Sequence, residues 1–531
     1  MLEYLKREAD RALTENGAAA HASAGSDCLD LFASVGALRS AEDREIIRRF
    51  VRAFSEDPDL ALKTLFYARD IRGGLGERKV FRVCLQWLAG NAPASVRKNL
   101  PYIAEFGRWD DLLCLLGTPC EKDALELIRT QLRADLEAMD IDDDVSLLAK
   151  WLPSFNASNA QTVRCARKTA RYLGMTDAAY RKTLTALRAR IRILENNLRE
   201  RDYTFDYAKQ PSKALFKYRR AFRRNDGQRY AEFLGKVSRG EAKLPTDVLM
   251  PYELVEPFLH FSWERRSFMR DISEAERQTL NATWASLPAF ANDENALAII
   301  DTSGSMYESG RPMPAAVALS LGIYFAEHNT GAFRNRFIEF SSRPRLIELK
   351  GKTFADRLQY AASFNEVADT NLEAVFDLIL VTALRNRLPQ KELPETLYLI
   401  SDMEFNACVK NAGATNFENA KAAFESHGYR LPRIVFWNVQ SRNAQQPVTQ
   451  NEQGVALVSD CTPRIFGMLK RETCPPWATC WKLWARNGTR RSRRNIGNLF
   501  SLTPGSRWAL GPCLIRSAAW FPGNCSRQPR R

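Results

Sequence analysis

The spacing of hydrophobic residues changes once along the chain, near residue 293. From residue 27 to about residue 285, apolar positions recur every three and four residues, as in "EDREIIRRFVRAFSEDPDLALKTLFYARD". This period is that of amphipathic helices, and Gly, Pro and Asn interrupt it often enough to separate successive helices. We therefore predict a helical module over residues 27–290, preceded by an N-terminal segment of residues 1–26.

Helix pairs joined by short breaks are typical of an α-solenoid with HEAT-like repeats, and we expect that arrangement here. No strict sequence repeat accompanies the helix pairs. A compact all-helical domain is therefore the alternative for the same residues.

Beyond residue 293 the chain has short runs rich in β-branched and aromatic residues. They are "NALAII", "RNRFIEFSS", "PRLIELK", "TLYLISD", "RIVFWNVQ" and "GVALVSD". Helical stretches such as "PAAVALSLGIYFAEH" and "NLEAVFDLILVTALRNR" lie between them. Strands alternating with helices predict a doubly wound, mostly parallel α/β domain over residues 293–470, which would bind ligands at the carboxyl ends of its strands.

Composition limits the class of protein. A chain of 531 residues is long enough for two or three domains. It has no run of about 20 apolar residues, and its N-terminus lacks the apolar core of a signal peptide. The eleven cysteines show no CxxC spacing. We expect a cytoplasmic protein without a disulfide framework and without a membrane partner.

The net charge of +15 is concentrated in two places. Residues 471–531 carry +11 with a single acid, and residues 181–243 carry another +11. The first of these is a basic tail rich in Trp, Cys and Arg and without sustained hydrophobic period. It could bind nucleic acid through interleaved aromatics, or it could be a disordered or frameshifted end. Because of this ambiguity, the charge of the tail predicts no function.

The stretch "AIIDTSGSMYESG" places oxygen-bearing side chains at the end of the first predicted strand. Asp301, Ser303 and Ser305 alternate, so that a tight loop can turn all three toward one point. Thr370 precedes a long helix, and Asp402 ends another apolar strand. Carboxylates and hydroxyls together are hard ligands suited to Mg²⁺ or Mn²⁺. The alternative is a helix-capping loop that holds no metal.

This constellation resembles the metal-ion-dependent adhesion site (MIDAS) of von Willebrand factor A domains, Asp-x-Ser-x-Ser followed by a Thr and an Asp on later loops. All five positions are present: Asp301, Ser303, Ser305, Thr370 and Asp402. The resemblance implies that the hydroxyls coordinate the ion directly, that the aspartates bind directly or through water, and that one position stays open for a partner's acidic group. No nucleophile–base pair is apparent, so we expect a binding protein and not an enzyme.

The helical module resembles the TROVE module of the Ro RNA-binding proteins. The resemblance rests on "GSDCLDLF", "LFYARDIRGGLGERKVFR", "GRWDDLL", "KYRRAFRRND" and "MPYELV". It is stronger toward an uncharacterised family of Ro-like proteins of unknown function. For Ro itself the resemblance implies a helical ring closed by the adhesion-type domain, with small RNAs bound to the ring.

The basic stretch within residues 181–243 is where the sequence itself could support RNA binding. Its candidate RNA-binding residues are Arg188, Arg192, Lys213, Lys217, Arg219, Arg220, Arg223 and Arg224. Phe216, Tyr218 and Phe222 are interleaved with them. Cations neutralise phosphates and exposed aromatics stack on unpaired bases. The alternative is an amphipathic helix whose aromatics are core and whose charges are solvated.

Together these features predict a Ro-like RNA-binding or ribonucleoprotein scaffold with a divalent-metal adhesion site. Its partners would be small or single-stranded RNA, or a protein that offers an acidic residue to the metal; DNA is not expected. The alternative is a metal-dependent protein–protein adaptor that does not bind RNA.

Overall fold

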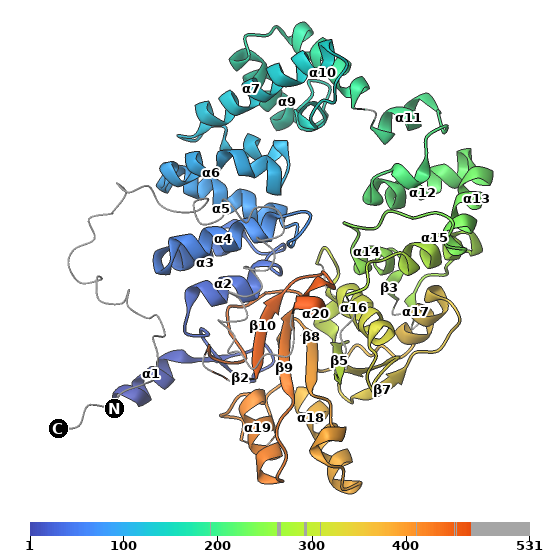
Figure 1. The fold of residues 1–531 in the computed structure, drawn as a ribbon. Helices are drawn as coiled ribbons and strands as arrows, with labels where there is room; N and C mark the ends of the chain where they lie inside the picture. Colours follow the sequence, from blue (N-terminus) through green and yellow to red (C-terminus); the bar gives the residue numbers. More distant parts are fainter. Residues whose placement is uncertain are drawn as a thin grey trace, which may run out of the picture.

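The computed structural model describes residues 1–468 except residues 192, 263–266, 291–294, 308–309, 410, 451 and 453. The predicted tail of residues 471–531 lies outside the described residues. The chain forms a helical part followed by an α/β domain with a mixed sheet, as the change in hydrophobic period predicts. Both ends of the helical part contact the α/β domain, so the ribbon closes into a ring (Figure 1).

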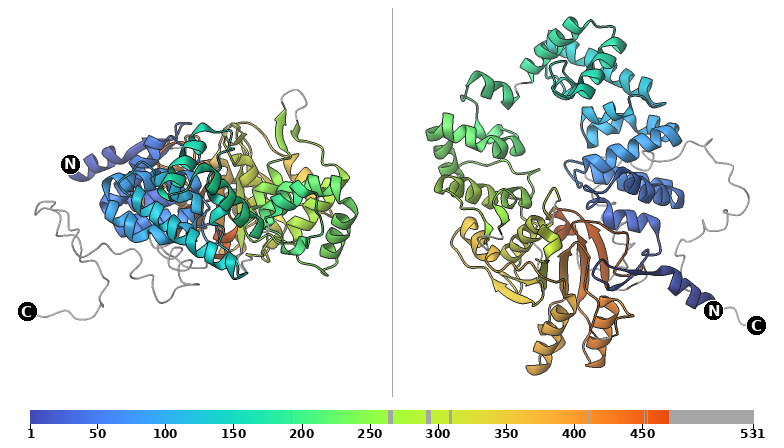
Figure 2. Two further views of the ribbon diagram at one scale, coloured as in Figure 1. Left: turned by 90° about the horizontal axis from the view of Figure 1, so that it is seen from above. Right: turned by 180° about the vertical axis from the view of Figure 1, so that it is seen from behind.

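The helices between residues 27 and 285 follow one another around an arch, and those within the arch pack mainly on helices close to them in the chain (Figures 1 and 2). The first half of the arch comprises α2 (Asp27–Val35), α3 (Asp43–Glu56), α4 (Pro58–Arg69), α5 (Arg78–Asn91), α6 (Pro93–Phe106) and α7 (Glu121–Asp140). The second half comprises α8 (Leu148–Trp151), α9 (Ala160–Tyr172), α10 (Asp177–Arg190), α11 (Leu194–Glu200), α12 (Ser212–Asn225), α13 (Gly227–Ser238), α14 (Pro251–Val255) and α15 (Glu274–Ala285). The arch differs from the compact alternative, while the HEAT-like character of its units stays a prediction.

Local sequence explains where these helices begin and which face they bury. Before α4, the Asp57 carboxylate accepts a hydrogen bond from the Leu60 N–H at 3.0 Å, and Pro58 occupies the first turn. Helix α3 buries Ile46, Phe50 and Ala53, which are three and four residues apart. The predicted helical module is not helical throughout, because β3 (Leu259–Ser262) and β4 (Ser267–Met269) form an antiparallel pair within it.

The α/β domain contains a six-stranded sheet in the order β10-β9-β8-β5-β6-β7. Its strands are β5 (Ala296–Asp301), β6 (Arg336–Phe340), β7 (Arg345–Glu348), β8 (Thr396–Ser401), β9 (Arg433–Asn438) and β10 (Val455–Ser459). All six predicted strand runs therefore form strands. Only the edge strand β7 is antiparallel to its neighbour. In chain order the sheet reads 3-2-1-4-5-6 from β7 to β10, the order of doubly wound folds.

Burial explains why these strands are continuous apolar runs. Every residue of β5 and β8 is buried, as expected of central parallel strands covered on both faces. Helix α16 (Pro314–His328) packs on β5, β6 and β8. The other helices of the domain are α17 (Phe354–Ala362), α18 (Leu372–Arg385), α19 (Asn416–Ser426) and α20 (Arg464–Met468).

The arch joins the domain at two places. At one end α2 packs on β10, and at the other α14 and α15 pack on α16 and α17. The N-terminal segment comprises α1 (Leu2–Asp10), β1 (Arg11–Leu13) and β2 (Ala19–His21). The β1–β2 part lies against the α/β domain, whereas α1 extends away from it (Figure 1). Residues 17, 19 and 21 form bridges to residues 406, 415 and 446.

Within the described residues, no helix is long and apolar enough to cross a membrane. The cysteines in this part of the chain are free thiols: Cys28, Cys84, Cys114, Cys120, Cys165, Cys408 and Cys461.

Candidate functional site

The carboxyl ends of β5 and β8 lie side by side at the centre of the sheet, where the order of the strands reverses. Ile300 pairs with Ile400 in parallel register, which places Asp301 beside Ser401 and Asp402 just beyond it. Doubly wound folds bind ligands in the crevice that opens at this point. The topology therefore brings the two predicted aspartates together.

The loop after β5 directs its polar side chains back toward Asp301. The Asp301 carboxylate accepts a hydrogen bond from the Ser303 N–H at 2.8 Å and another from the Ser401 hydroxyl at 2.6 Å. The hydroxyl oxygens of Ser303 and Ser305 are 3.3 Å apart. The loop therefore brings the hydroxyls of Ser303 and Ser305 close to each other beside Asp301.

Backbone contacts place the Thr370 loop between the other two. The Gly304 N–H donates to the Ala368 carbonyl at 3.2 Å, which joins it to the loop after β5. The Asn406 N–H donates to the Thr370 carbonyl at 2.9 Å, which joins it to the loop after β8. The three predicted loops therefore meet at one edge of the sheet.

The interior of this site is closed to solvent and rich in negative charge. The exposed fractions of Asp301, Ser303, Thr370 and Asp402 are at most 1%. Burial and repulsion from Asp402 raise the pKa of Asp301 to about 7. Burial also raises the pKa of Asp402, although the Arg442 guanidinium and the Ser305 hydroxyl act in the opposite direction. Two buried carboxylates so close together favour a bound proton or cation.

The donor set fits a hard divalent cation. Two carboxylates and three hydroxyls supply only oxygen, the ligand type that Mg²⁺ and Mn²⁺ prefer. In the described part of the chain, this site included, no three His, Cys, Asp or Glu side chains gather as a metal group, so the hydroxyls would have to complete the donor set. No described histidine is hydrogen-bonded to a residue of this site: His21 contacts Asp10, and His328 and His427 contact backbone carbonyls.

Arg442, in the loop after β9, is a functional candidate that the sequence prediction missed. One guanidinium nitrogen lies 2.9 Å from the Asp402 carboxylate and another lies 2.9 Å from the Glu15 carboxylate. Arg442 follows the run "RIVFWNVQ" by two residues, in the loop at the same edge of the sheet as Asp402. The prediction could therefore have included it.

The turn of residues 14–17 also reaches the site, from the other end of the chain. The Asn16 amide donates to the Glu404 carbonyl at 2.5 Å and lies 3.4 Å from the Thr370 hydroxyl. The Glu15 N–H donates to the Glu404 carboxylate at 2.6 Å. Glu404 is 1% exposed and also accepts hydrogen bonds from Asn443 and Gln445. No local pattern in the sequence indicates these contacts.

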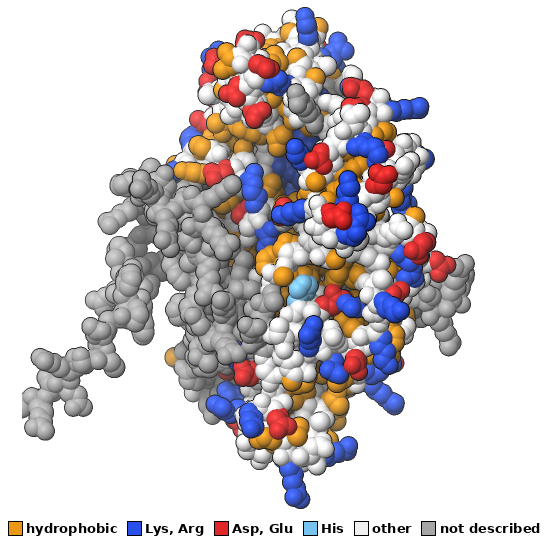
Figure 3. Space-filling view, turned by 45° about the vertical axis from the view of Figure 1, so that its right-hand side comes forward, with side chains coloured by type: hydrophobic (Ala, Val, Ile, Leu, Met, Phe, Trp, Pro, Cys, Tyr) orange, Lys and Arg blue, Asp and Glu red, His pale blue; other side chains and the backbone are white. Residues whose placement is uncertain are grey.

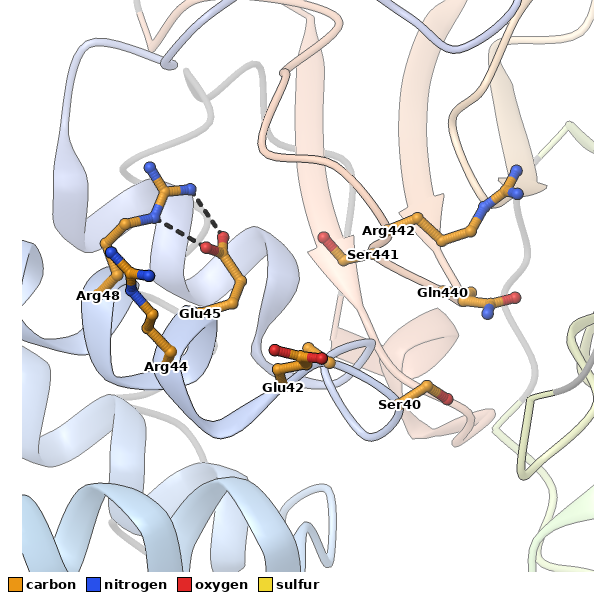
Figure 4. A pocket seen from close by; sticks show the side chains of 9 residues that line it. Ser40, Glu42, Arg44, Glu45, Arg48, Gln440, Ser441 and Arg442 are labelled. Atoms are coloured by element: carbon orange, nitrogen blue, oxygen red, sulfur yellow. Dashed lines mark hydrogen bonds and ion pairs between the residues drawn. The ribbon is translucent and has the colours of Figure 1, made fainter.

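A cleft of about 650 Å³ lies next to the site, between α3 and the loop after β9. Figure 4 shows Arg44, Glu45 and Arg48 projecting from α3, with Arg48 paired to Glu45. Arg442 points away from α3 (Figure 4), toward its partner Asp402. Arg442 therefore lines the cleft and also contacts Asp402 of the candidate metal site.

The predicted RNA-binding residues divide into two groups. Arg188 and Arg219 hold the fold: Arg188 donates to the carbonyls of Ala149 and Leu152, both at 2.8 Å. Arg219 is 8% exposed and lies 4.0 Å from the centre of the Phe216 ring. Arg192 lies outside the described residues.

The second group is a stripe of cations along one face of α12. It consists of Lys213, Lys217, Arg220 and Arg224, spaced four, three and four residues apart and all exposed. Lys213 pairs with Glu253, whereas Glu276 lies 3.0 Å from Arg220 and 3.7 Å from the less exposed Arg223. Figure 3 shows cations interspersed with acids on the face where α11–α15 lie.

The two phenylalanines of α12 belong to the core and not to this surface, whereas Tyr218 is half-buried. Phe222 is fully buried and Phe216 is 8% exposed. Phe222 packs with Tyr207 and Tyr230 in a small cluster of rings. The prediction that these two phenylalanines stack on RNA bases is therefore wrong. They belong to the buried face of an amphipathic helix, as the alternative predicted.

The fold and the site define a class of protein: a helical arch closed by a doubly wound α/β domain that has an oxygen-rich site at its strand ends. Residues 14–129 and 124–293 match a family described as domain of unknown function DUF2828. These residues are more than half of the chain, and the chain belongs to this family. Residues 295–471 match a second domain of unknown function, DUF7788.

Individual relatives add little about function. An uncharacterized protein of Acanthamoeba polyphaga mimivirus is 29% identical over 499 residues, which cover 86% of this chain and 84% of the relative. Among solved structures, the Ro protein of Deinococcus radiodurans matches 81% of this chain and 92% of its own, with 13% identity and a TM-score of 0.31. A TM-score of this size carries no conclusion about fold or ligand.

Proposed function

We propose that the protein is a non-enzymatic binding protein that holds Mg²⁺ or Mn²⁺ at the carboxyl ends of β5 and β8 and captures an acidic group there. The convergence of two buried carboxylates and three hydroxyls carries this proposal. The hydroxyls of Ser303, Ser305 and Thr370 would hold the ion, with Asp301 and Asp402 beside them. When bound, a divalent cation supplies a positive centre that an oxyanion can approach.

The residues of the chain prepare the site for this role. The Ser303 N–H and the Ser401 hydroxyl hold the Asp301 carboxylate in one orientation. Burial removes competing water, and burial together with the neighbouring Asp402 raises the pKa of Asp301, so a cation bound there would relieve the cost of its charge. Arg442 supports Asp402 from the outer side. These contacts would fix the two aspartates in position to hold an ion and the ligand that binds to it.

The test is Mn²⁺ binding, measured by the loss of the free-ion electron paramagnetic resonance signal. We expect one site in the wild-type chain and none in Asp301→Asn. Asp460→Asn is a matched control, because Asp460 is also a fully buried carboxylate after a parallel strand, with a pKa raised by burial to about 8. Equal Mn²⁺ binding by the wild-type chain and Asp301→Asn would refute the proposal.

RNA binding is a second candidate, and the exposed cation stripe of α12 favours it. We propose that Lys213, Lys217, Arg220 and Arg224 contact phosphates of single-stranded RNA. Each such contact steepens the dependence of log affinity on log salt by about 0.7 for a single strand. Reversal of charge at Lys217 and Arg224 should therefore weaken filter binding and reduce the slope by about 1.4.

The tail complicates this measurement, since residues 471–531 carry +11. The full chain and a chain ending at residue 470 should be compared. Loss of RNA binding without the tail, or an unchanged salt slope in the double reversal, would favour the adaptor function, in which a protein supplies the acidic group.

A further inference from the structure

The turn of residues 14–17 lies on the loop that follows Asp402, at the edge of the candidate metal site. Gly17 takes a φ of +83°, and the hydroxyl of Thr14 accepts the Ala18 N–H at 2.9 Å. The same hydroxyl donates to the Phe405 carbonyl at 2.5 Å. With the two contacts to Glu404, the turn is attached to the loop that follows Asp402.

Glu15 and Arg442 form a charged path from the buried site to solvent. The side chain of Asp402 is 0% exposed, that of Arg442 is 23% exposed and that of Glu15 is 52% exposed. The guanidinium holds Asp402 with one nitrogen and Glu15 with another. An acidic group that approaches from solvent therefore reaches Arg442 where Glu15 now binds.

We propose that Glu15 is an internal acidic ligand, which a partner's carboxylate or phosphate displaces from Arg442 when it binds at the metal site. This inference rests on the proposed function. Arg442 is then the residue that positions the incoming oxyanion, and the turn of residues 14–17 is the part of the chain that must yield.

The charges around the site support an exchange in preference to simple addition. Three carboxylates are close together here. Those of Asp402 and Glu15 both contact the Arg442 guanidinium, and that of Glu404 accepts the Glu15 N–H. A further acid would be repelled unless one of these carboxylates leaves. Glu404 is buried and accepts three hydrogen bonds. Glu15 is half exposed and has one ion-pair partner, so Glu15 is the carboxylate that can leave at least cost.

The experiment uses the full chain saturated with Mn²⁺ and two probes, acetate and inorganic phosphate, titrated calorimetrically. A half-exposed ion pair contributes about 0.4–1 kcal/mol, so Glu15→Gln should bind the preferred probe about two- to five-fold more tightly than wild type. Preference for acetate would indicate a carboxylate ligand, and preference for phosphate a phosphorylated one. Glu8→Gln, an exposed acid in α1, should bind as wild type does.

A double-mutant cycle with Arg442→Gln isolates the exchange. Removal of Arg442 should weaken probe binding, and Glu15→Gln should then have no further effect, because the competition occurs at that guanidinium. Unchanged or weaker probe binding in Glu15→Gln, or an equal gain in the Arg442→Gln background, overturns the inference. If the wild-type chain binds Mn²⁺ and the gain is absent, the inference fails alone. If it binds no Mn²⁺, the proposed function fails with it.

Hydrogen exchange gives a second readout that does not depend on affinity. Probe binding should accelerate exchange at the Glu15 N–H, which is held by Glu404. The His21 N–H, held by the Gln446 carbonyl at 2.9 Å outside the turn, should exchange at its original rate. Unchanged exchange at both positions under saturating probe would also overturn the inference.

Discussion

Asp301→Asn in the metal-free protein tests whether the site stores negative charge for a cation. The substitution keeps the size of the side chain and leaves an oxygen to accept the Ser303 N–H. It removes the charge that burial and Asp402 oppose. Without metal, we expect the variant to be more stable than wild type at neutral and alkaline pH.

The pKa of Asp301 gives the size and sign of the effect. The folded protein holds the proton up to a pKa of about 7, whereas an unperturbed aspartate releases it near 3.8. The folded state therefore binds more protons than the unfolded state in this window, and stability falls as the pH rises through it. At about 1.4 kcal/mol per pH unit, the loss between about pH 4 and pH 7 is about 4 kcal/mol.

The assay is urea unfolding at several pH values, in chelator and in excess Mg²⁺. Burial also raises the pKa of Glu339 and of Asp460, so the difference between wild type and Asp301→Asn is the informative quantity. In chelator this difference should grow toward about 4 kcal/mol in favour of the variant as the pH rises. In Mg²⁺ it should shrink or reverse. A difference independent of both pH and Mg²⁺ would refute the reasoning.

Three further substitutions probe the site and the frame around it. Thr370→Val should weaken Mn²⁺ binding roughly ten-fold, as loss of one interaction of about 1.4 kcal/mol does. It should change the unfolding of the metal-free chain by no more than about 1 kcal/mol, the contribution of the long contact from the Asn16 amide. Gly36→Ala should lower the free energy of unfolding in urea by about 1–3 kcal/mol, because the new Cβ would lie 2.3 Å from the Ser459 carbonyl oxygen. Gly90→Ala is its control: the Cβ there meets no atom within 4 Å, and the stability should be unchanged or higher. Asp111→Asn should cost about 3–5 kcal/mol by the same measurement, because Asp111 is fully buried between two arginines.

The sequence predicts a part of the site where polar residues directly follow an apolar run that forms a strand. Apolar runs in parallel strands end at one edge of a sheet, so polar residues at the ends of β5 and β8 must meet. For that reason the convergence of Asp301, Ser303, Ser305 and Asp402 followed from strand order and loop spacing. The helices of the arch followed in the same way from the period of their apolar residues, whereas that period left a compact all-helical domain open as the alternative.

The contacts of the N-terminal turn could not be predicted, because they depend on how the ring closes. Thr14 and its partner Phe405 are 391 positions apart, and neither stands in a pattern that indicates a long-range contact. The exposure of α12 was ambiguous for another reason. Cations and aromatics alternate there at helical spacing, and only packing decides that Phe222 is core while Arg224 is solvated.

The candidate site lies where the arch and the α/β domain join, and this location connects ligand binding to the closure of the ring. Arg49 of α3 donates to the Ser441 hydroxyl at 2.8 Å and to the Asn443 carbonyl at 2.9 Å, within the loop that carries Arg442. The same loop supports Glu404 through Asn443. A ligand that draws Arg442 away from Glu15 therefore acts on a loop that α3 also holds. The arch and the candidate metal site are therefore joined through this loop by direct hydrogen bonds of Arg49 and Arg442.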